Sequence, residues 1–316
     1  MMANFIKVVL FLIVVVGIGI YFFSHPPQIF QGGPQEKVFP TNSNSGFLGF
    51  QYSAPLAPIT PNYINSPTTV ISSQSTQIPD YLIPSGYTRL QLSPYFQKVK
   101  ISSAYASYYS NYPSQFQLYA YLPAGEKIDI TGWNIKTNHG GFIIPQAVNI
   151  YAPLGFYGPS PEENIIISGN ANINIYSNRS PVNVNFRLNK CTGYLANNYS
   201  FNPSLPQICP TTSRSEISYL SGQCQSYIFS LGSCKEPNIA IYNSFPGNDE
   251  GNACRQFLST INQITCFQKY HGDADFLSNE WRIWINWTGL NNILDSQHDA
   301  VRLLDKNGLL VDQYIY

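Results

Sequence analysis

Short stretches of alternating apolar and polar residues recur along much of the chain from residue 99 onwards. Such a period of two predicts a half-buried strand, because successive side chains point to opposite faces of a sheet. Two apolar runs without alternation add further short strands. The stretches and runs before residue 190 are 99–103, 116–120, 128–132, 142–145, 165–167, 171–176 and 182–188. Many short strands in succession predict an antiparallel β-sandwich.

The pattern changes between about residues 190 and 279. Apolar residues in 215–231 and 253–264 recur at spacings of three and four. That spacing places them on one face of a helix, so each stretch predicts a short amphipathic helix. We expect these helices to form an insertion into the β structure.

The alternation returns after the insertion. Residues 281–287 place aromatic and aliphatic side chains between polar ones, and the apolar runs 300–304 and 309–316 flank Asp305-Lys306-Asn307-Gly308. Asn-Gly between apolar runs is a strong hairpin signal. The sequence therefore predicts a mainly β domain over residues 93–316, interrupted at about 190–279.

A different pattern covers the N-terminus. Residues 5–23 are apolar apart from Lys7 and two glycines, and Pro26-Pro27 follows. A helix of about 20 apolar residues spans a bilayer core, whereas the apolar core of a cleaved signal peptide has about 7–15 residues. We expect an uncleaved single-pass anchor in the cell membrane, with residues 1–4 in the cytoplasm and the bulk of the chain outside.

Residues 24–92 are rich in Pro, Ser, Thr, Asn and Gln, and lack a sustained helical or strand period. Such a composition is typical of a stalk that holds a domain away from a membrane. We expect no structured subdomain there, because no apolar cluster could form its core.

Charged residues make up 11% of the chain, and the formal net charge is zero. Typical soluble domains have about 25% charged residues. Nucleic-acid binding needs a concentrated positive face, which the balanced charge does not supply. We therefore exclude nucleic acid as a partner, and the low charge favours a protein of the cell surface.

Six cysteines lie within the expected insertion: Cys191, Cys209, Cys224, Cys234, Cys254 and Cys266. An even number of cysteines in a protein outside the cytoplasm predicts up to three disulfides. The sequence lacks the C-x-x-C pairs that are typical of a zinc site. Six cysteines allow 15 connectivities. Local closure favours Cys191–Cys209, Cys224–Cys234 and Cys254–Cys266, the first more than the other two.

The flanks of the insertion resemble the bacterial lamin-tail domain. Val99-Lys100-Ile101 and Gln117-Leu118-Tyr119-Ala120 look like its opening strand pair, and residues 128–135 are similar to its "L-x-G-W-x-L" signature, with Gly132 and Trp133. Residues 299–312 resemble its closing "D-x-V-x-L-x-D-x-x-G-x-x-V-D" hairpin, with Asp305 and Gly308. The match covers about 130 residues.

This resemblance implies an immunoglobulin-like fold and a binding or structural module rather than an enzyme. The insertion of about 90 residues is not part of the ordinary domain, so no binding face is carried over. We assign Trp133 to the core, where a large ring can bridge two sheets and Gly132 lets the backbone turn beside it.

His271, Asp273 and Asp275 form the most suggestive cluster for chemistry. Their alternation could ligate Ca²⁺ or another divalent cation, although a calcium loop usually supplies more oxygens. The favoured reading is a loop in which Asp275 caps a short helix over residues 276–280. We expect no metal and no cofactor.

Trp284 falls on the opposite face of its strand from Trp281 and Trp287. It either packs beneath the insertion, which we favour, or is exposed as a platform for a sugar or a protein.

The sequence contains no strong catalytic motif: it lacks a nucleophile elbow, a phosphate-binding loop and H-E-x-x-H. We therefore expect a non-catalytic structural or interaction module of the cell surface, which binds an envelope polymer, a glycan or a protein. The alternative is a carbohydrate-active hydrolase of the envelope with its site in the insertion, which would need two carboxylates in a cleft.

Overall fold

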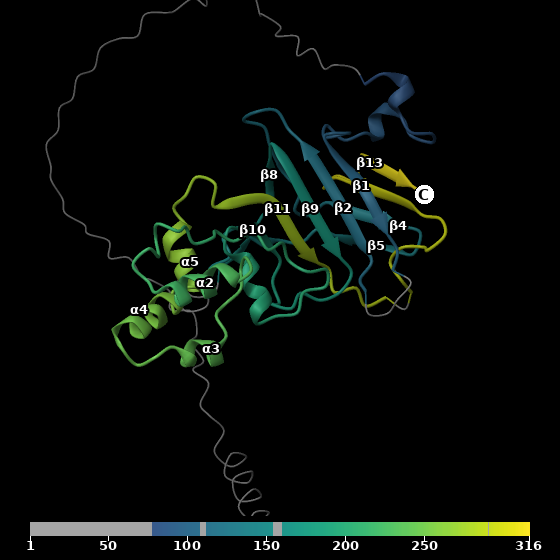
Figure 1. Cartoon of the computed structure of the whole chain (residues 1–316). Coiled ribbons are helices and arrows are strands. Elements are labelled where there is room, and N and C mark those ends of the chain that lie inside the picture. The colour runs from purple at the N-terminus through teal and green to yellow at the C-terminus, as the bar shows by residue number, and fades with distance from the viewer. Residues whose placement is uncertain (1–77, 108–111, 154–159, 290) are drawn as a thin grey trace, which may run out of the picture. The chain divides into compact units, whose positions relative to one another are not determined.

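A computed structural model describes residues 78–107, 112–153, 160–289 and 291–316 (Figure 1). The expected anchor at 5–23 and most of the expected stalk lie outside these residues. Within the described ranges, no helix is both long enough and apolar enough to cross a membrane.

The described chain is mainly β, with two larger sheets and one small pair of strands. The larger sheet has the order β1-β2-β9-β11-β10-β6-β7, the second has β13-β12-β4-β5, and β3 pairs with β8. The strands of the larger sheet are β1 (Val99–Tyr105), β2 (Gln115–Tyr121), β6 (Ala147–Val148), β7 (Glu162–Glu163), β9 (Asn170–Tyr176), β10 (Phe186–Asn189) and β11 (Leu277–Trp284). The others are β3 (Lys127–Asp129), β4 (Asn134–Thr137), β5 (Gly140–Ile143), β8 (Ile166–Ser168), β12 (Ala300–Leu304) and β13 (Leu310–Ile315).

The larger sheet is mixed, so the expectation of a wholly antiparallel arrangement is wrong. Strand β11 lies between β9 and β10, antiparallel to β10 and parallel to β9. A strand placed between two antiparallel neighbours must be parallel to one of them. Strands β6 and β10 are also parallel. Alternation along a strand does not reveal its neighbours, so the sequence could not show this order.

The two larger sheets share one hydrophobic core. The inward side chains of the larger sheet include Leu118, Ile173 and Ile283, and those of the second sheet include Ile135 and Val301. All five are fully buried. Their polar neighbours along each strand face outward, as the period of two predicts.

Gly132-Trp133 and the Asp305–Gly308 turn adopt the local structures expected from their residues. Gly132 has φ = +80°, a conformation that favours glycine, and the buried ring of Trp133 lies 5.5 Å from that of Tyr95. In the β12–β13 hairpin, Asp305 Oδ1 accepts hydrogen bonds from the backbone N–H of Asn307 and of Leu309. Gly308 there has φ = +78°. The predicted hairpin is therefore confirmed.

Residues 78–92, which we expected to end the stalk, pack against the domain. They contain two short 3₁₀ helices, η1 (Asp80–Leu82) and η2 (Arg89–Gln91). Ile78, Ile83 and Leu92 belong to a small apolar cluster with Leu304 and Leu310. The segment contributes apolar contacts to the hairpin rather than acting as a free spacer.

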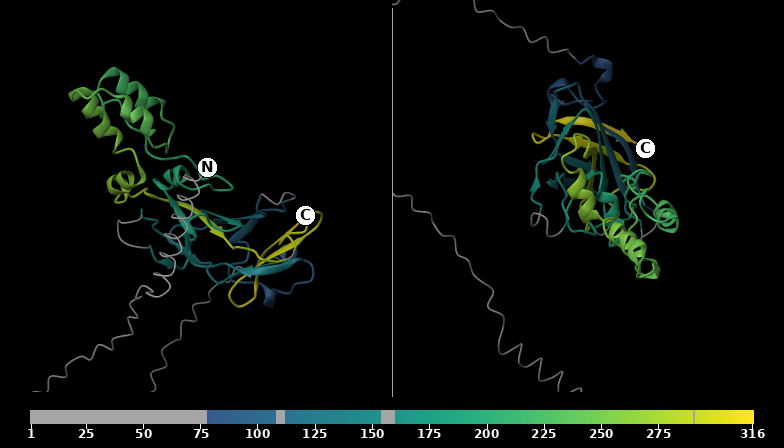
Figure 2. Two further views of the ribbon diagram at one scale, coloured as in Figure 1. Left: turned by 90° about the horizontal axis from the view of Figure 1, so that it is seen from below. Right: turned by 60° about the vertical axis from the view of Figure 1, so that its left-hand side comes forward.

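The helical region lies between β10 and β11, as predicted. It contains η3 (Thr192–Asn197), α2 (Gly222–Ser230), α3 (Ile239–Ser244), α4 (Asp249–Leu258) and α5 (Gln263–Tyr270). Helices α2, α3 and α4 form one group, whereas α5 lies apart from them in the left view of Figure 2 and packs with η3. The expected helix over 253–264 is in fact two helices, and α3 was not predicted. Asn262 ends the continuity, because its side chain accepts from Thr265 N and caps α5.

All six cysteines form disulfides, but the expected pairing is wrong. The bonds are Cys191–Cys266, Cys209–Cys234 and Cys224–Cys254. Cys191–Cys266 joins the two ends of the insertion. The other two bonds overlap in sequence, because Cys224 lies between Cys209 and Cys234. Local closure was a poor guide because the helices fold back on one another and bring distant cysteines together.

Candidate functional site

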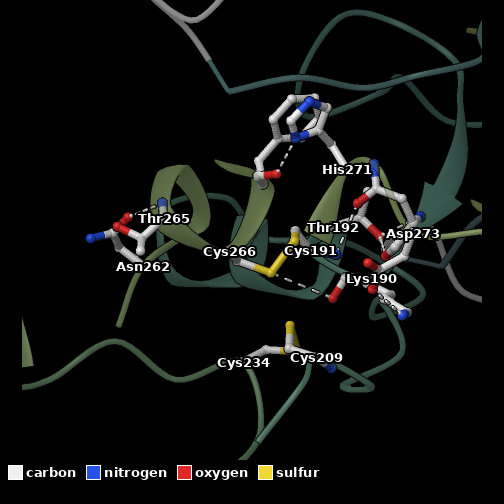
Figure 3. The surroundings of a disulfide bond; sticks show 12 residues. Lys190, Cys191, Thr192, Cys209, Cys234, Asn262, Thr265, Cys266, His271 and Asp273 are labelled. Atoms are coloured by element: carbon white, nitrogen blue, oxygen red, sulfur yellow. Dashed lines mark hydrogen bonds and ion pairs between the residues drawn. A yellow bond between two sulfur atoms is a disulfide. The ribbon is translucent and has the colours of Figure 1, made fainter. Parts of the chain in front are cut away.

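The base of the insertion carries an ion-pair cluster beside a disulfide (Figure 3). Lys190 Nζ lies 2.8 Å from Asp273 Oδ2 and 2.5 Å from Asp275 Oδ1. The hydrogen bonds that Lys190 donates to Asp273 and Asp275 raise the pKa of Lys190, and the one to Asp275 lowers the pKa of that carboxyl. The next residue, Cys191, is bonded to Cys266.

These contacts give the suspected metal ligands another role. The two carboxylates bind an ammonium group, and His271 Nδ1 lies 3.0 Å from Phe267 O while its ring stacks on that of Phe267. The described residues contain no group of three or more potential metal ligands. The proposed helix over 276–280 is wrong, because β11 begins at Leu277. The cluster therefore ties the two ends of the insertion together.

Two hollows of about 100 and 220 Å³ lie in the insertion, on either side of residues 210–212. Tyr194 and Ile261 contribute to both. Of the residues that line them, Glu216 is the one carboxylate, and its Oε1 lies 2.5 Å from Lys269 Nζ. That hydrogen bond lowers the pKa of Glu216. A glycosidase needs a second carboxylate nearby, so neither hollow has the groups for this chemistry.

Trp284 packs beneath the insertion, which was the favoured prediction. Its side chain is 6% exposed and packs among Tyr176, Phe186 and Phe201, with ring centroids 5.5–6.0 Å away. Phe201 belongs to the insertion, and the other two belong to the sheet. Trp284 is therefore not an exposed platform, although it is among the residues that line a hollow described below. Trp281 and Trp287 face the main core on the other side.

The outer face of β1, β2, β9 and β11 is instead the open surface of the larger sheet. Tyr105, Tyr119 and Tyr121 are 52%, 37% and 72% exposed. Neighbouring strands place amide side chains beside them, since Tyr119 pairs with Asn172 and Tyr121 with Asn170. We call this surface the tyrosine–amide face; its members are Lys100, Ser102, Tyr105, Gln115, Gln117, Tyr119, Tyr121, Asn170, Asn172, Asn174 and Glu280.

The charges at the β11 side of this face are paired with each other. Glu280 Oε1 lies 2.7 Å from Arg282 Nη2 and accepts a hydrogen bond from Asn174 Nδ2 at 3.0 Å. Arg282 also donates to the hydroxyl of Tyr176. Burial is the main cause that raises the pKa of Tyr176, so this phenol stays protonated. The network fixes the orientation of the Asn174 amide and pairs the charges on the β11 side, so that Lys100, opposite Tyr119 on β1, is the charged member of the face outside it.

The tyrosine–amide face can therefore offer flat rings, hydroxyl groups, and amides that both donate and accept hydrogen bonds. The sequence contained its signal, because Gln115, Gln117, Tyr119 and Tyr121 alternate with buried residues in β2. That alternation was interpreted only as a strand. The order of the strands, which joins β2 to the Asn-rich β9, was needed to find the surface.

Comparison with family models, with curated proteins and with solved structures found no match.

Proposed function

We propose that the described domain is a non-catalytic binding module of the cell surface, and that its tyrosine–amide face binds a neutral polysaccharide. The observation that carries this proposal is the alignment of three exposed tyrosines with rows of amide side chains across four neighbouring strands. An exposed surface of this kind in a protein with few charges favours a partner that is also rich in hydroxyl groups.

The chemistry of the face matches a neutral sugar chain better than a charged one. A sugar ring has an apolar face that can stack on an aromatic ring, and hydroxyl groups that both donate and accept hydrogen bonds. Tyrosine combines a flat apolar ring with a polar end, and Asn and Gln amides have both donors and acceptors. Glu280 and Arg282 neutralise each other, so they do not select for an ionic ligand.

The sequence supports the place of this module. An anchor at residues 5–23 and a stalk over most of 24–92 would carry the domain outside the cell membrane. The resemblance to the lamin-tail domain favours an immunoglobulin-like binding module over an enzyme. Disulfides agree with an extracytoplasmic location, because they persist in oxidising compartments. Membrane anchoring predicts a mature N-terminus at residue 1 or 2 and retention in the membrane after carbonate extraction; an N-terminus near residue 25 would contradict it.

Binding of the purified full chain to a panel of polysaccharides and to a glycan array tests the proposal. We expect a neutral glycan to bind, and the Tyr119→Ala/Tyr121→Ala variant to lose at least about tenfold in affinity, since stacking contacts and their hydrogen bonds are removed together. Tyr81→Ala is the matched control, because Tyr81 is 85% exposed but lies in η1, away from this face.

Two results would contradict the proposal. One is glycan binding that the paired tyrosine variant leaves unchanged. The other is the absence of glycan binding while crosslinking on cells captures a protein through Tyr119 and Tyr121, which would make the face a protein-binding surface, as the enrichment of Tyr at protein interfaces also allows.

A further inference from the structure

A polar hollow lies at the end of β11, where the chain between β9 and β10 passes beside it. Its volume is about 400 Å³, larger than either hollow in the insertion and within the range of about 300–1,000 Å³ typical of small-molecule sites. Two segments line it: Arg179, Ser180, Asn183, Val184 and Asn185 from the connection, and Trp284 and Asn286 from the end of β11 and just after it.

Of the residues that line this hollow, Arg179 alone is charged. Arg179 is exposed and forms no ion pair within the described part of the chain, and the lining contains no acidic residue. A guanidinium group presents five N–H donors in a planar fork that matches a carboxylate. A lone arginine in a concave polar site therefore selects for an anion.

Groups around Arg179 fit a ligand that carries hydroxyls as well as a negative charge. Asn183 and Asn286 both have positive φ, at 61° and 46°, and both line the hollow. The Ser180 hydroxyl donates to Val184 O and keeps its lone pairs as acceptors. The set thus combines one cation with several neutral donors and acceptors.

The inner wall is held in place by hydrogen bonds of Asn185 and includes the buried Trp284. Asn185 holds it, because its Oδ1 accepts from Trp284 N at 2.7 Å and its Nδ2 donates to Gln146 O at 3.2 Å. The indole N–H of the buried Trp284 has no acceptor in the described structure. A buried donor without a partner is unfavourable, and a ligand oxygen reaching it after a small side-chain shift would relieve that cost.

We propose that this hollow binds one acidic sugar unit, a hexuronate, with its carboxylate on Arg179 and its hydroxyls on Asn183, Asn286 and Ser180. This site is separate from the tyrosine–amide face, and its ligand belongs to a different class from the neutral polysaccharide proposed there. The chain would thus hold two carbohydrate sites with opposite preferences for charge.

Titration of the full chain with D-glucuronate, and with glucose as its neutral counterpart, tests the site. Calorimetry and tryptophan fluorescence should both detect glucuronate, because Trp284 forms a wall of the hollow. We expect glucose to bind at least about tenfold more weakly, and Arg179→Gln to weaken glucuronate binding by about tenfold or more, as the loss of a charged hydrogen bond implies. The binding should also weaken as salt is added.

Arg302→Gln is the matched control, because Arg302 is exposed on β12 of the other sheet. Tyr119→Ala/Tyr121→Ala should leave glucuronate binding unchanged, so failure of this site can be told apart from failure of the tyrosine–amide face. Equal loss in the Arg179 and Arg302 variants, equal binding of glucose and glucuronate, or no binding of glucuronate by a folded chain would each overturn the proposal.

Discussion

The backbone N–H of Ile101 donates a hydrogen bond of 2.7 Å to Asp312 Oδ2. Ile101 lies in β1, the edge strand of the larger sheet, and Asp312 lies in β13, the edge strand of the second sheet. The bond therefore links the edges of the two sheets directly, beside the core that they share. It uses an N–H at a bulge in β1, where the register with β2 shifts between Ile101 and Ser103.

The Asp312 carboxylate should make the stability of the domain depend on pH. Burial is the main cause that raises the pKa of this carboxyl above 3.8. The folded state then binds a proton more strongly than the unfolded state, so stability falls as pH rises from the unfolded pKa through the raised folded pKa, and is constant above it. Asp312→Asn removes the charge but keeps an oxygen acceptor, and should abolish this fall in urea unfolding measured at several pH values.

Asp312→Ala is the companion variant, because it removes the acceptor as well as the charge. Leaving the Ile101 N–H without a partner should cost about 1–3 kcal/mol of unfolding free energy. If Asn and Ala destabilise the domain equally at neutral pH, the bond to Ile101 contributes nothing and the proposed link between the sheets is wrong.

The strands were predictable where one face of each is buried. Alternation in 116–120 and 171–176 reports a local property, and the Asp305–Gly308 turn has its own chemical signal, so these elements agree with the structure. The position of β11 between β9 and β10 depends on contacts between distant residues. No local pattern encodes it, and the mixed sheet follows from it, whereas the tyrosine–amide face follows from the equally non-local pairing of β2 with β9.

The candidate sites, too, were predictable where the signal is local and not where it depends on distant residues. The face of its strand on which Trp284 lies followed from the period of two, and its burial was the favoured alternative. The partner of Asp273 and Asp275 was not predictable, because Lys190 is more than 80 residues away in sequence and meets them only when β10 and β11 pair. The disulfide pairing failed for the same reason.

Gly193 should be essential to the packing of the insertion. A Cβ at this position would overlap Cys234 Sγ and lie 2.9 Å from Pro206 O. Gly193→Ala should therefore destabilise the insertion by about 1–3 kcal/mol through overpacking, or prevent the Cys209–Cys234 bond from closing. Gly222→Ala is the control, because nothing lies within 4 Å of its Cβ, and it should change stability by less than about 1 kcal/mol. Urea unfolding and thiol titration distinguish the outcomes; a neutral Gly193→Ala would show that the Cys209–Cys234 disulfide is loosely packed at this point.

Lys190→Met should loosen the start of β11 without unfolding the sheets. It leaves Asp273 and Asp275 without their cation, so amide exchange at residues 273–276 should become faster than in the wild type. Because Lys190 lowers the pKa of Asp275, its contribution is present above the unfolded pKa of that carboxyl and is lost as pH falls through the lowered value. The two proteins should therefore converge in acid and at high salt.

Lys127→Met is the control for Lys190→Met, since Lys127 is an exposed residue of β3. A difference between wild type and Lys190→Met that persists unchanged in acid would mean that the lost aliphatic packing of Lys190, rather than its charge, holds the segment.

The helical group α2–α4 should depend on its own disulfide more than on the sheets. Its small core, which includes Ile217, Ile228 and Leu258, is distinct from the core between the sheets and surrounds Cys224–Cys254. That bond closes a loop with a sequence separation of 30 residues, worth about 3–4 kcal/mol in the chain-entropy model. Replacing both cysteines by Ala should abolish amide protection in α2 and α4 while β2 and β9 keep theirs, as hydrogen exchange can measure. Equal loss of protection at Trp133 would show instead that the insertion and the sheets unfold as one cooperative unit.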